Sequence, residues 1–554
     1  MCLLTALVIA MTGGAAAHGA PGPPGPAAAA ERAGQGTARD TGEEGSGKEL
    51  TGDIDFSVPS GTFQDELTVA LGTAVPGAEI RYTTDGTLPT ASSPLYSGPL
   101  ELTATTQLRA QAFTDGAAEG EPGTALYVAR SFDAAHDLPL LVMDAYGAGK
   151  PGREYADAAA LLMEPESGTA SLSAAPALAT RAGFHLRGQS SAMFEKAPYR
   201  LEWWDNHDDD ARHPVLGMPA EADWVLRGPF ADKSLIRTAL MYELGRKTGM
   251  RVPRHRFVEV YLNLDDGPLE AADYQGVYMI TETIENSGDR LDLKELGEDD
   301  ISEPAVTGGY VFKFEWFAAE EPTLACTGDA ATCWRDLEVA EPSQLRPEQE
   351  EWLTGYVQGF HDSLRGEDPS DPRTGYPAYI DTDSFVDQVV LNELSREMDA
   401  YIRSQYFHKD REGKIFAGPL WDYNLTFGTG GYFGNQLIEG WQFEQIRQLP
   451  ANDWFVRLMD DPSFVQRVDE RWRTLRQGPL SDGALTALVD ELAAPLTGAA
   501  GRNFARWPNL TEPMVGPFVT PTADTWQGQV DQLRDWMLRR AAWLDSSGWR
   551  PDAG

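Results

Sequence analysis

Cysteine is scarce in this chain, which has three among 554 residues, one of them the second residue, Cys2. The other two, Cys326 and Cys333, flank a short polar loop. A zinc site would need further ligands close by, and this stretch of sequence offers none. We therefore expect a disulfide between Cys326 and Cys333, as is usual for neighbouring cysteines of an exported protein.

Basic residues are also few, with 45 lysines and arginines against 85 aspartates and glutamates and a formal net charge of −40. This balance disfavours nucleic acid, whose phosphates need basic side chains, and anionic membrane surfaces. It favours solubility and attracts divalent metals and basic protein segments. Adaptation to a salty or extracellular setting explains the same charge without any specific partner.

No apolar run approaches the ~20 residues that span a bilayer, so we expect no transmembrane segment. Residues 3–11 form a short apolar run, and three alanines follow at 15–17. This pattern predicts a signal peptide over residues 1–20, without the basic residues that usually open one. Cys2 precedes the apolar run, which argues against a lipoprotein anchor. The expected location is secreted or at the cell surface.

The chain divides into segments that differ in composition and hydrophobic pattern, and its length suggests two to four domains. Residues 21–50 are rich in Ala, Gly, Pro and Glu, which predicts a disordered linker. Short alternating strands punctuated by turns predict a small β-sandwich over residues 54–132. Residues 137–430 mix apolar strands with amphipathic helices, and residues 431–554 are mostly helical. The predicted fold class is therefore α+β.

Two aspartates in the second half of the chain are the leading catalytic candidates. Asp399 closes an amphipathic helix predicted over residues 385–397, for which Asp383 is the predicted N-cap. Asp422 lies in a strand predicted over residues 420–424, after another short strand and a hairpin turn. A hairpin can return Asp422 toward Asp399.

Two converging carboxylates suit several kinds of chemistry. With Asn424, on the same side of its predicted strand, Asp422 could hold a divalent cation through hard oxygen ligands. A carboxylate could also accept a proton from a hydroxyl nucleophile while the metal bridges phosphates. A glycosidase likewise needs two carboxyl groups, ~5 to 9.5 Å apart. Alternatively, the two aspartates are ordinary surface residues of an acid-rich protein and have no chemical role.

Basic residues upstream of these acids are candidate phosphate ligands. Arg187 precedes a glycine, and Lys196 and Arg200 fall on the next stretch of apolar sequence. Lys233 comes just before a helix predicted over residues 234–244, whose N-terminal amides would attract an anion. Solvated surface charges would give the same pattern. The sequence contains neither a Walker loop nor the usual glycine loop of protein kinases.

Part of the predicted sandwich resembles a known module. Residues 56–63, 80–90 and 108–113 are similar to the Ig-like domain found at the C-terminus of chitobiases and hexosaminidases. The string Tyr-Thr-Thr-Asp-Gly-Thr-x-Pro-Thr is the most specific part. In that family the module is accessory, which implies that Asp85 forms a turn rather than acts as an acid. Carbohydrate thereby becomes a candidate ligand of the sandwich.

A longer resemblance rests on motifs between about residues 140 and 430. These motifs are, in order, Arg187-Gly188-x-Ser190, Lys196-x-Pro198-Tyr199-Arg200-Leu201, Asp232-Lys233-Ser234-Leu235-Ile236-Arg237, Tyr274-Gln275-Gly276-Val277-Tyr278 with Glu282, and Pro419-Leu420-Trp421-Asp422-Tyr423-Asn424. Together they resemble the spore-coat CotH kinase family. The resemblance implies a protein-kinase-like fold that uses ATP and Mg²⁺ or Mn²⁺ to phosphorylate secreted or spore-coat proteins.

The same resemblance implies roles for individual residues. Asp399 would orient and deprotonate the acceptor hydroxyl, and Asp422 would bind the metal with Asn424 beside it. Glu282 would pair with a lysine near the nucleotide. The basic residues expected at the ATP phosphates are Arg187, Lys196 and Lys233.

Two positions depart from the family pattern. Asn424 stands where the family often has aspartate, and Ser404 stands where it often has asparagine, five residues after the catalytic aspartate. Both side chains can still ligate Mg²⁺ or hold water, but each exchange predicts weaker metal binding.

Three functions remain open at this point. We expect a secreted Ser/Thr kinase that acts on extracellular or cell-surface proteins. A catalytically weak or inactive surface or adhesion protein on the same fold, binding protein or carbohydrate, is the second reading. A carbohydrate-active enzyme is the third, although no glycosidase motif is apparent.

Overall fold

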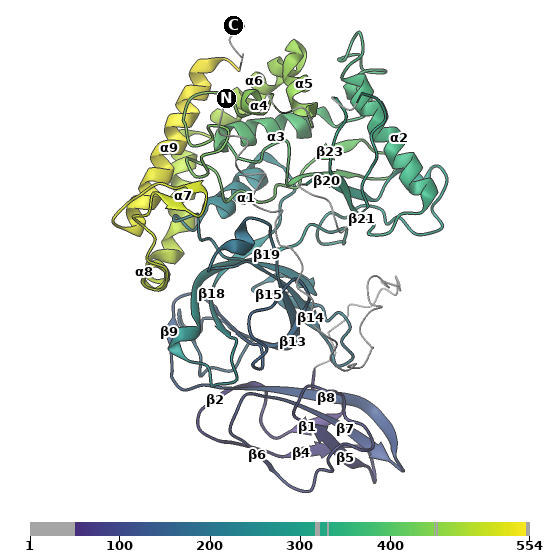
Figure 1. Ribbon diagram of the computed structural model, residues 1–554, viewed down its shortest axis with the longest axis vertical. Coiled ribbons are helices and arrows are strands. Elements are labelled where there is room, and N and C mark those ends of the chain that lie inside the picture. Colours follow the sequence, from purple (N-terminus) through teal and green to yellow (C-terminus); the bar gives the residue numbers. More distant parts are fainter. Residues whose placement is uncertain (1–49, 316–321, 330–331, 448, 450–451, 550–554) are drawn as a thin grey trace, which may run out of the picture. The chain divides into compact units, whose positions relative to one another are not determined.

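The computed structural model describes residues 50–315, 322–329, 332–447, 449 and 452–549. The predicted signal peptide and all but the last residue of the predicted linker lie outside these ranges. Strands dominate the first part of the described chain and helices its C-terminal end (Figure 1). The predicted α+β class is therefore confirmed.

The first strands form a β-sandwich, as the alternating pattern predicted. Its largest sheet has the order β2-β8-β7-β5, and the pairs β1-β4 and β3-β6 complete it. Asp85 accepts hydrogen bonds from the N–H and hydroxyl groups of Thr87, at 3.1 and 2.6 Å, so this aspartate forms a turn. The strands are β1 Ile54–Phe56, β2 Gly61–Phe63, β3 Leu67–Val69, β4 Leu71–Thr73, β5 Glu79–Thr83, β6 Leu100–Leu102, β7 Thr106–Thr114 and β8 Ala117–Ala129.

Buried polar groups join the sandwich to the strands that follow. The side-chain amide of Asn206 donates to the carbonyl of Pro122 at 2.7 Å and accepts from the hydroxyl of Thr124 at 2.6 Å. The backbone carbonyl of Asn206 accepts from the guanidinium group of Arg109, which is buried. These groups are closed to a ligand, so a carbohydrate site would have to lie elsewhere on the sandwich.

Seven strands then close into a barrel, in the order β10-β11-β13-β14-β17-β19-β18 (Figure 1). Its neighbouring strands are antiparallel except β10 and β18, which pair in parallel. The strands are β10 Leu140–Asp144, β11 Ala156–Met163, β13 Leu178–Leu186, β14 Tyr199–Trp204, β17 Asp223–Arg227, β18 His255–Asn263 and β19 Tyr274–Glu282.

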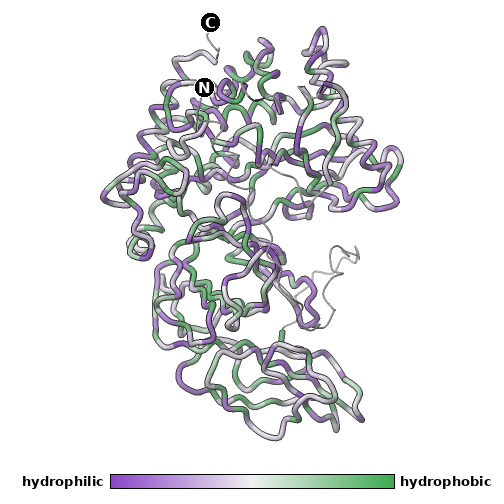
Figure 2. The backbone as a smooth tube through the Cα atoms, in the orientation of Figure 1, coloured by the Kyte–Doolittle hydropathy of each residue, from purple (hydrophilic) through white to green (hydrophobic). Residues whose placement is uncertain are grey.

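Strand β10 is apolar at almost every position because both of its faces are buried. Leu141 and Met143 belong to the barrel core, whereas Leu140 and Val142 pack outward with Leu126 of the sandwich strand β8. Successive side chains of a strand face opposite sides, so a strand covered on both sides needs apolar residues throughout. Figure 2 shows the resulting concentration of hydrophobic backbone in the barrel.

A second sheet and a set of helices follow. The sheet has the order β21-β20-β22-β23, and helix α3 packs against β23, α1, α6 and α9. Its elements and the main helices are β20 Tyr310–Phe314, β21 Leu337–Glu341, β22 Gln405–Lys409, β23 Ile415–Ala417, α1 Arg237–Thr248, α2 Pro347–Ser363, α3 Thr382–Ser395, α4 Gln442–Ile446, α5 Trp454–Asp460, α6 Pro462–Arg476, α7 Asp482–Ala493, α8 Thr497–Arg506 and α9 Trp526–Ser547. No helix in the described ranges is long and apolar enough to cross a membrane.

Short elements complete the described chain. Cys326 and Cys333 form a disulfide, which confirms the pairing expected from their spacing. The remaining strands are β9 Ala135–His136, β12 Ala170–Ser171, β15 His213–Val215, β16 Met218–Glu221, β24 Met514–Val515 and β25 Phe518–Val519.

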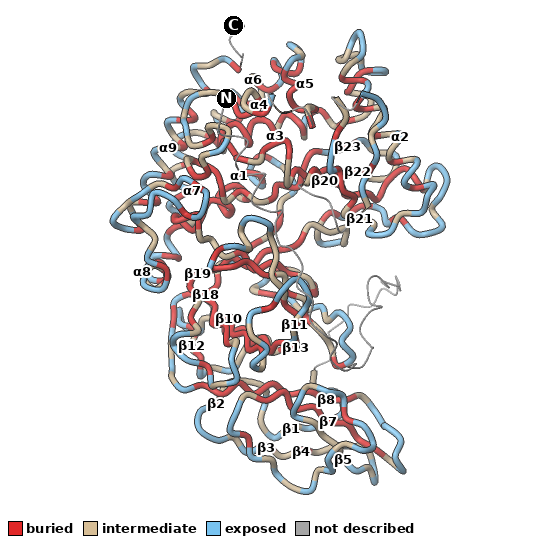
Figure 3. The backbone as a smooth tube through the Cα atoms, viewed as in Figure 1, coloured by how far each residue is buried: buried red, intermediate tan, exposed pale blue. Residues whose placement is uncertain are grey.

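Most of helix α3 is buried (Figure 3). It carries the fully buried carboxylate of Glu393, which is surrounded by donors. It accepts hydrogen bonds from the N–H groups of Gln442 and Phe443, at 2.8 and 3.0 Å, and from the hydroxyl of Tyr401 at 3.0 Å. The equally buried guanidinium group of Arg540, on α9, lies 3.2 Å away. One negative charge thus joins α3, α4, α9 and the loop that contains Tyr401.

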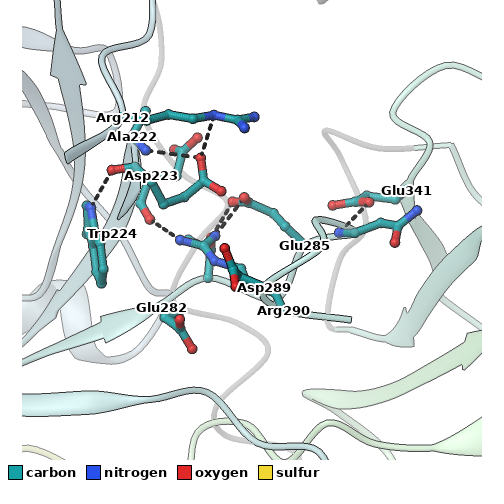
Figure 4. A network of polar contacts seen from close by, with 12 residues as sticks. Arg212, Ala222, Asp223, Trp224, Glu282, Glu285, Asp289, Arg290 and Glu341 are labelled. Carbon is teal, nitrogen blue, oxygen red and sulfur yellow. Dashed lines mark hydrogen bonds and ion pairs between the residues drawn. The ribbon is translucent and has the colours of Figure 1, made fainter. Parts of the chain in front are cut away.

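A second polar network joins the barrel to the second sheet (Figure 4). Arg290 donates to the carboxylate of Glu285 at 2.6 Å and to the carbonyl of Asp223, in β17, at 2.8 Å. The carboxylate of Glu341, in β21, accepts from the N–H of Asn286 at 2.8 Å. Burial raises the pKa of Glu341 to about 7, and the nearby charge of Glu285 adds to the rise.

The Glu393→Gln variant tests the first network. Glutamine keeps the shape but leaves the buried guanidinium group of Arg540 without its counter-charge, which costs about 3–5 kcal/mol. We expect the free energy of unfolding to fall by about that amount in urea denaturation followed by tryptophan fluorescence. The control is Glu298→Gln, which removes an exposed partner of Arg346 and should cost less than about 1 kcal/mol. Equal effects of the two variants would contradict the assignment.

The Glu341→Gln variant tests the second network through pH. Because the folded pKa is raised to about 7 from 4.5, the folded state holds a proton that the unfolded state loses in this window. The contribution of Glu341 to stability therefore falls as pH rises from about 4.5 to about 7.

Glutamine stays neutral at every pH, so the variant should match the wild type at pH 4, below both pKa values. At pH 8 it should be more stable by on the order of 1 kcal/mol. Melting temperatures recorded across this range by circular dichroism give the comparison. A stability difference that is the same at both pH values would rule out a raised pKa for Glu341.

Candidate functional site

The helix that leads to Asp399 has different ends from those predicted. Asp381, not Asp383, is its N-cap, since the carboxylate of Asp381 accepts the N–H of Ser384 at 2.9 Å. The helix ends at Ser395 because Arg396 adopts the left-handed conformation, with φ at 46°. Asp399 is therefore not the end of a helix but part of the loop behind it.

Within that loop Asp399 makes an ion pair. Its backbone carbonyl accepts the N–H groups of Ile402 and Arg403, at 3.2 and 3.1 Å, which makes a tight turn. Its carboxylate accepts from the guanidinium group of Arg403 at 3.1 Å and is 24% exposed. The hydroxyl of Tyr401, which bonds to Glu393, anchors this turn to α3. The acid is thus held in place and still reachable from solvent.

The prediction of a strand over residues 420–424 is wrong. The last strand before Asp422 is β23, and Asp422 lies in a loop with φ at 66°, in the left-handed region that is uncommon for residues other than glycine. Asn424 is consequently not aligned with Asp422 by strand alternation. The contact that accompanies the unusual backbone is an ion pair with Arg227, whose Nη1 lies 2.7 Å from Oδ1 of Asp422.

The indole ring of Trp421 connects this pair to the barrel. The guanidinium carbon of Arg227, the last residue of β17, lies 4.2 Å from the centre of the ring, and that of Arg187, beyond β13, lies 5.4 Å from it. Contacts of this kind are attractive because the face of an indole is electron-rich. Trp421 thereby gathers two arginines from the end of the barrel beside Asp422.

The charges of the site influence one another. Burial raises the pKa of Asp399 to about 6, Arg403 opposes the rise, and the negative charge of Asp422 adds to it. Burial and the charge of Asp399 also hold the pKa of Glu397 well above its usual range. Burial beside the like charge of Arg227 lowers the pKa of Arg187 to about 10. The structure therefore brings Asp399, Asp422 and Arg187 into one electrostatic cluster.

The two lysines predicted to contact phosphate have other partners. The ammonium group of Lys196 is fully buried and donates to the carbonyl of Val277 at 2.5 Å and to the side-chain oxygen of Asn503 at 2.7 Å. That of Lys233 donates to the carbonyl groups of Leu510 and Pro521, at 3.3 and 3.0 Å. Phosphate could reach either ammonium group only by displacing these bonds, so the structure gives both lysines a packing role.

The N-terminus of α1 already holds an anion of the protein itself. The carboxylate of Asp232 accepts the N–H groups of Ser234 and Arg237, at 3.0 and 2.8 Å, and pairs with the Arg237 guanidinium at 2.6 Å. The expectation that these amides receive a ligand is therefore corrected, because the carboxylate of Asp232 fills that position.

Glu282 pairs with an arginine rather than with a lysine. Its carboxylate accepts the N–H and the Nε of Arg254, both at 2.7 Å. Both residues line a cavity of about 260 Å³, together with Arg290 and Pro419. Neither Asp399 nor Asp422 is among the described residues that line it, so Glu282 belongs to a neighbouring feature and not to the cluster of the two acids.

A divalent metal fits the donors around Asp422 in part. The carboxylate of Asp422 is 44% exposed, and the side chain of Asn424 makes no hydrogen bond within the described chain. Both offer hard oxygen atoms, and Mg²⁺ is typically held by one or two carboxylates together with substrate phosphates. No group of three or more His, Cys, Asp or Glu suited to a metal occurs among the described residues. Phosphate oxygens would have to complete such a site.

Arg227 and Arg403 contact the candidate acids directly, and sequence reasoning assigned them no role. Arg227 ends an apolar strand just before Gly228 and Pro229. An arginine at such a strand end, in a chain with far fewer basic than acidic residues, is the signal that could have singled it out. Arg403 stands four residues after Asp399, but only the observed turn makes that spacing a contact.

Comparison with known proteins gives two family matches. Residues 58–124 match the family model of the chitobiase/beta-hexosaminidase C-terminal domain, within the sandwich. No curated protein matches the chain. Residues 184–544 match the family model described as CotH kinase protein, which covers the barrel from the end of β13 onward, the second sheet and nearly all of the helical part, including both acids. The chain therefore belongs to the CotH kinase family.

Proposed function

We propose that this protein is a secreted, ATP- and divalent-metal-dependent kinase that phosphorylates serine or threonine residues of extracellular or coat proteins. The observation that carries the proposal is the cluster of Asp399 and Asp422 with the two arginines around Trp421. Phosphoryl transfer needs these parts: a base for the acceptor, an oxygen ligand for a metal, and positive charge for phosphate. Membership of the kinase family supports the same reading.

Asp399 is the proposed base. The acceptor hydroxyl would bond to its carboxylate, give up its proton to it, and form the new bond to the γ-phosphorus as the bond between that phosphorus and ADP breaks. With its pKa at about 6, Asp399 is mostly ionised at neutral pH and yet basic enough to take a proton. Arg403 fixes the direction of the carboxylate through their ion pair.

Asp422 and Asn424 are the proposed metal ligands, and Arg187 and Arg227 the proposed phosphate ligands. A bound divalent ion would supply positive charge to bridge and neutralise the phosphates of ATP. Arg227 would exchange its bond to Asp422 for a bond to phosphate. Throughout the reaction, the ring of Trp421 would keep both guanidinium groups beside Asp422. The roles proposed for Lys196, Lys233 and Glu282 at the nucleotide have no support in their observed partners.

The second candidate is a weak or inactive relative that acts by binding protein or carbohydrate. The observation that favours it is the ion pair of Asp422 with Arg227, which occupies the proposed metal ligand, together with Asn424 and Ser404 at positions where the family often has other residues. The chitobiase-type sandwich would provide the carbohydrate site. A glycosidase has no further support, because no fitting motif accompanies the two acids.

Substitution of the two acids tests the kinase. Incubation with labelled ATP, Mg²⁺ or Mn²⁺ and a generic acceptor protein should label the acceptor, and Asp399→Asn and Asp422→Asn should each lower labelling at least about 100-fold. Asp399→Asn should still bind nucleotide, since it loses only the base. The matched control is Asp383→Asn, an exposed aspartate at the start of α3. Absence of nucleotide binding by the wild type, or undiminished labelling by both variants, would refute the kinase.

Substitution of Asn424 tests the metal site. Asn424→Asp adds a second carboxylate beside Asp422, so the Mg²⁺ concentration that gives half-maximal labelling should fall about tenfold. Gln64→Glu, which adds a carboxylate at an exposed position of the sandwich, is the control and should leave this concentration unchanged. A metal requirement that Asn424→Asp does not alter would place the ion elsewhere.

A further inference from the structure

Four apolar side chains are exposed together near the candidate acids. They lie in or beside the hairpin of β24 and β25, which also carries the buried ring of Phe518. Isolated apolar residues on a surface are ordinary, but a contiguous group marks an interaction site. We call these four the apolar patch, with exposed fractions of 64% for Met193, 46% for Met514, 39% for Tyr432 and 37% for Val519.

Contacts show that the patch is contiguous. The ring centre of Phe518 lies 6.2 Å from that of Tyr432 and 6.1 Å from that of Phe194, which follows Met193 in the chain. The segments that carry Tyr432 and Met193 therefore meet on the same aromatic ring, although they are far apart in sequence.

The hairpin supplies the other two members. Met514 and Val519 are paired across it. Val519 also exchanges backbone hydrogen bonds with Gly430, at 2.9 and 3.0 Å, two residues before Tyr432. The hairpin is thus fastened by its backbone to the segment that follows Asp422, and the patch is built from both.

The buried cluster beneath the patch also includes residues from the loops of the two acids. Met398 and Leu425 belong to the same buried cluster as Phe194 and Phe518. The N–H of Met398 donates to the carbonyl of Leu425 at 3.3 Å, so the loop of Asp399 and the loop of Asp422 meet above this cluster. The loops of both acids therefore share one buried cluster with the residues beneath the patch.

We propose that the apolar patch binds the acceptor polypeptide, through an apolar side chain that flanks the serine or threonine presented to Asp399. This inference rests on the proposed function. The formal net charge of −40 decides against other occupants, because it repels a second copy of this chain and an anionic membrane alike. A neutral or basic polypeptide meets no such repulsion.

Binding by the full chain tests the inference with fluorescein-labelled peptides of about ten residues. Each has a central threonine and one leucine at a chosen flanking position, and each is matched with a peptide that has asparagine in place of leucine. We expect at least one leucine peptide to bind about tenfold more tightly than its partner, as burial of one apolar side chain allows. Fluorescence anisotropy gives both affinities.

Variants locate the effect. The double variant Met193→Ser, Met514→Ser should abolish the preference for leucine, since both side chains are exposed and outside the proposed catalytic machinery. Leu95→Ser, which replaces a leucine of the sandwich that is 48% exposed, should keep it. Melting temperatures equal to that of the wild type would show that each variant is folded.

Each outcome has one meaning. Equal binding of matched peptides, or a preference that survives in the double variant, overturns the inference. So does self-association or binding to anionic vesicles that the double variant loses, because the patch then serves another occupant. Labelling of the peptides with ATP separates the two proposals: transfer without a leucine preference defeats the inference alone, whereas a preference without transfer defeats the proposed kinase and the acceptor role together.

Discussion

The buried carboxylate of Glu393 is the interaction on which the C-terminal half depends. Removing a charge from water is costly, and the cost is recovered only where every lone pair finds a donor. Here two N–H groups, a hydroxyl and a guanidinium group converge on it, from α4, the loop with Tyr401, and Arg540 on α9. These segments cannot separate without exposing that charge to an apolar interior. Since the loop with Tyr401 also carries Asp399, the same carboxylate sets the position of the candidate base.

Much of the fold could be predicted because strands that are buried on both faces appear in the sequence as continuous apolar runs. Strand β10 is a continuous apolar run, and β18, β19 and β20 were located by the same property. Closure of the barrel could not be predicted, because the parallel pairing of β10 with β18 joins residues more than a hundred positions apart. Local pattern also failed at 420–424, where apolar residues are buried by a loop and the left-handed backbone of Asp422 accompanies its contact with Arg227.

The site residues could be predicted where the residue type alone decides the chemistry. They could not be predicted where the role of a side chain depends on contacts with distant segments. The acids Asp399 and Asp422 were identified as candidates, and the structure brings them into one electrostatic cluster. Lys196 and Lys233 were equally reasonable phosphate ligands by sequence, but carbonyl groups from distant segments hold both. Arg227 was overlooked because its role depends on an aspartate 195 positions away. A scarcity of basic residues makes each arginine near an acid more informative than its local motif suggests.

The ion pair of Arg227 with Asp422 bears on whether a metal could bind at the site, because its two partners differ in burial. The carboxylate of Asp422 is 44% exposed, so water can solvate it, whereas the guanidinium group of Arg227 is buried and would be left without a counter-charge if the bond broke. A divalent ion at Asp422 would therefore need a phosphate that takes over the contact with Arg227. The observed contact joins one pair of atoms, Nη1 of Arg227 and Oδ1 of Asp422, and a phosphate oxygen could accept the same bond. Under the proposed function, the pair is the resting partner of both groups, and it opens only when a nucleotide brings phosphate and metal together.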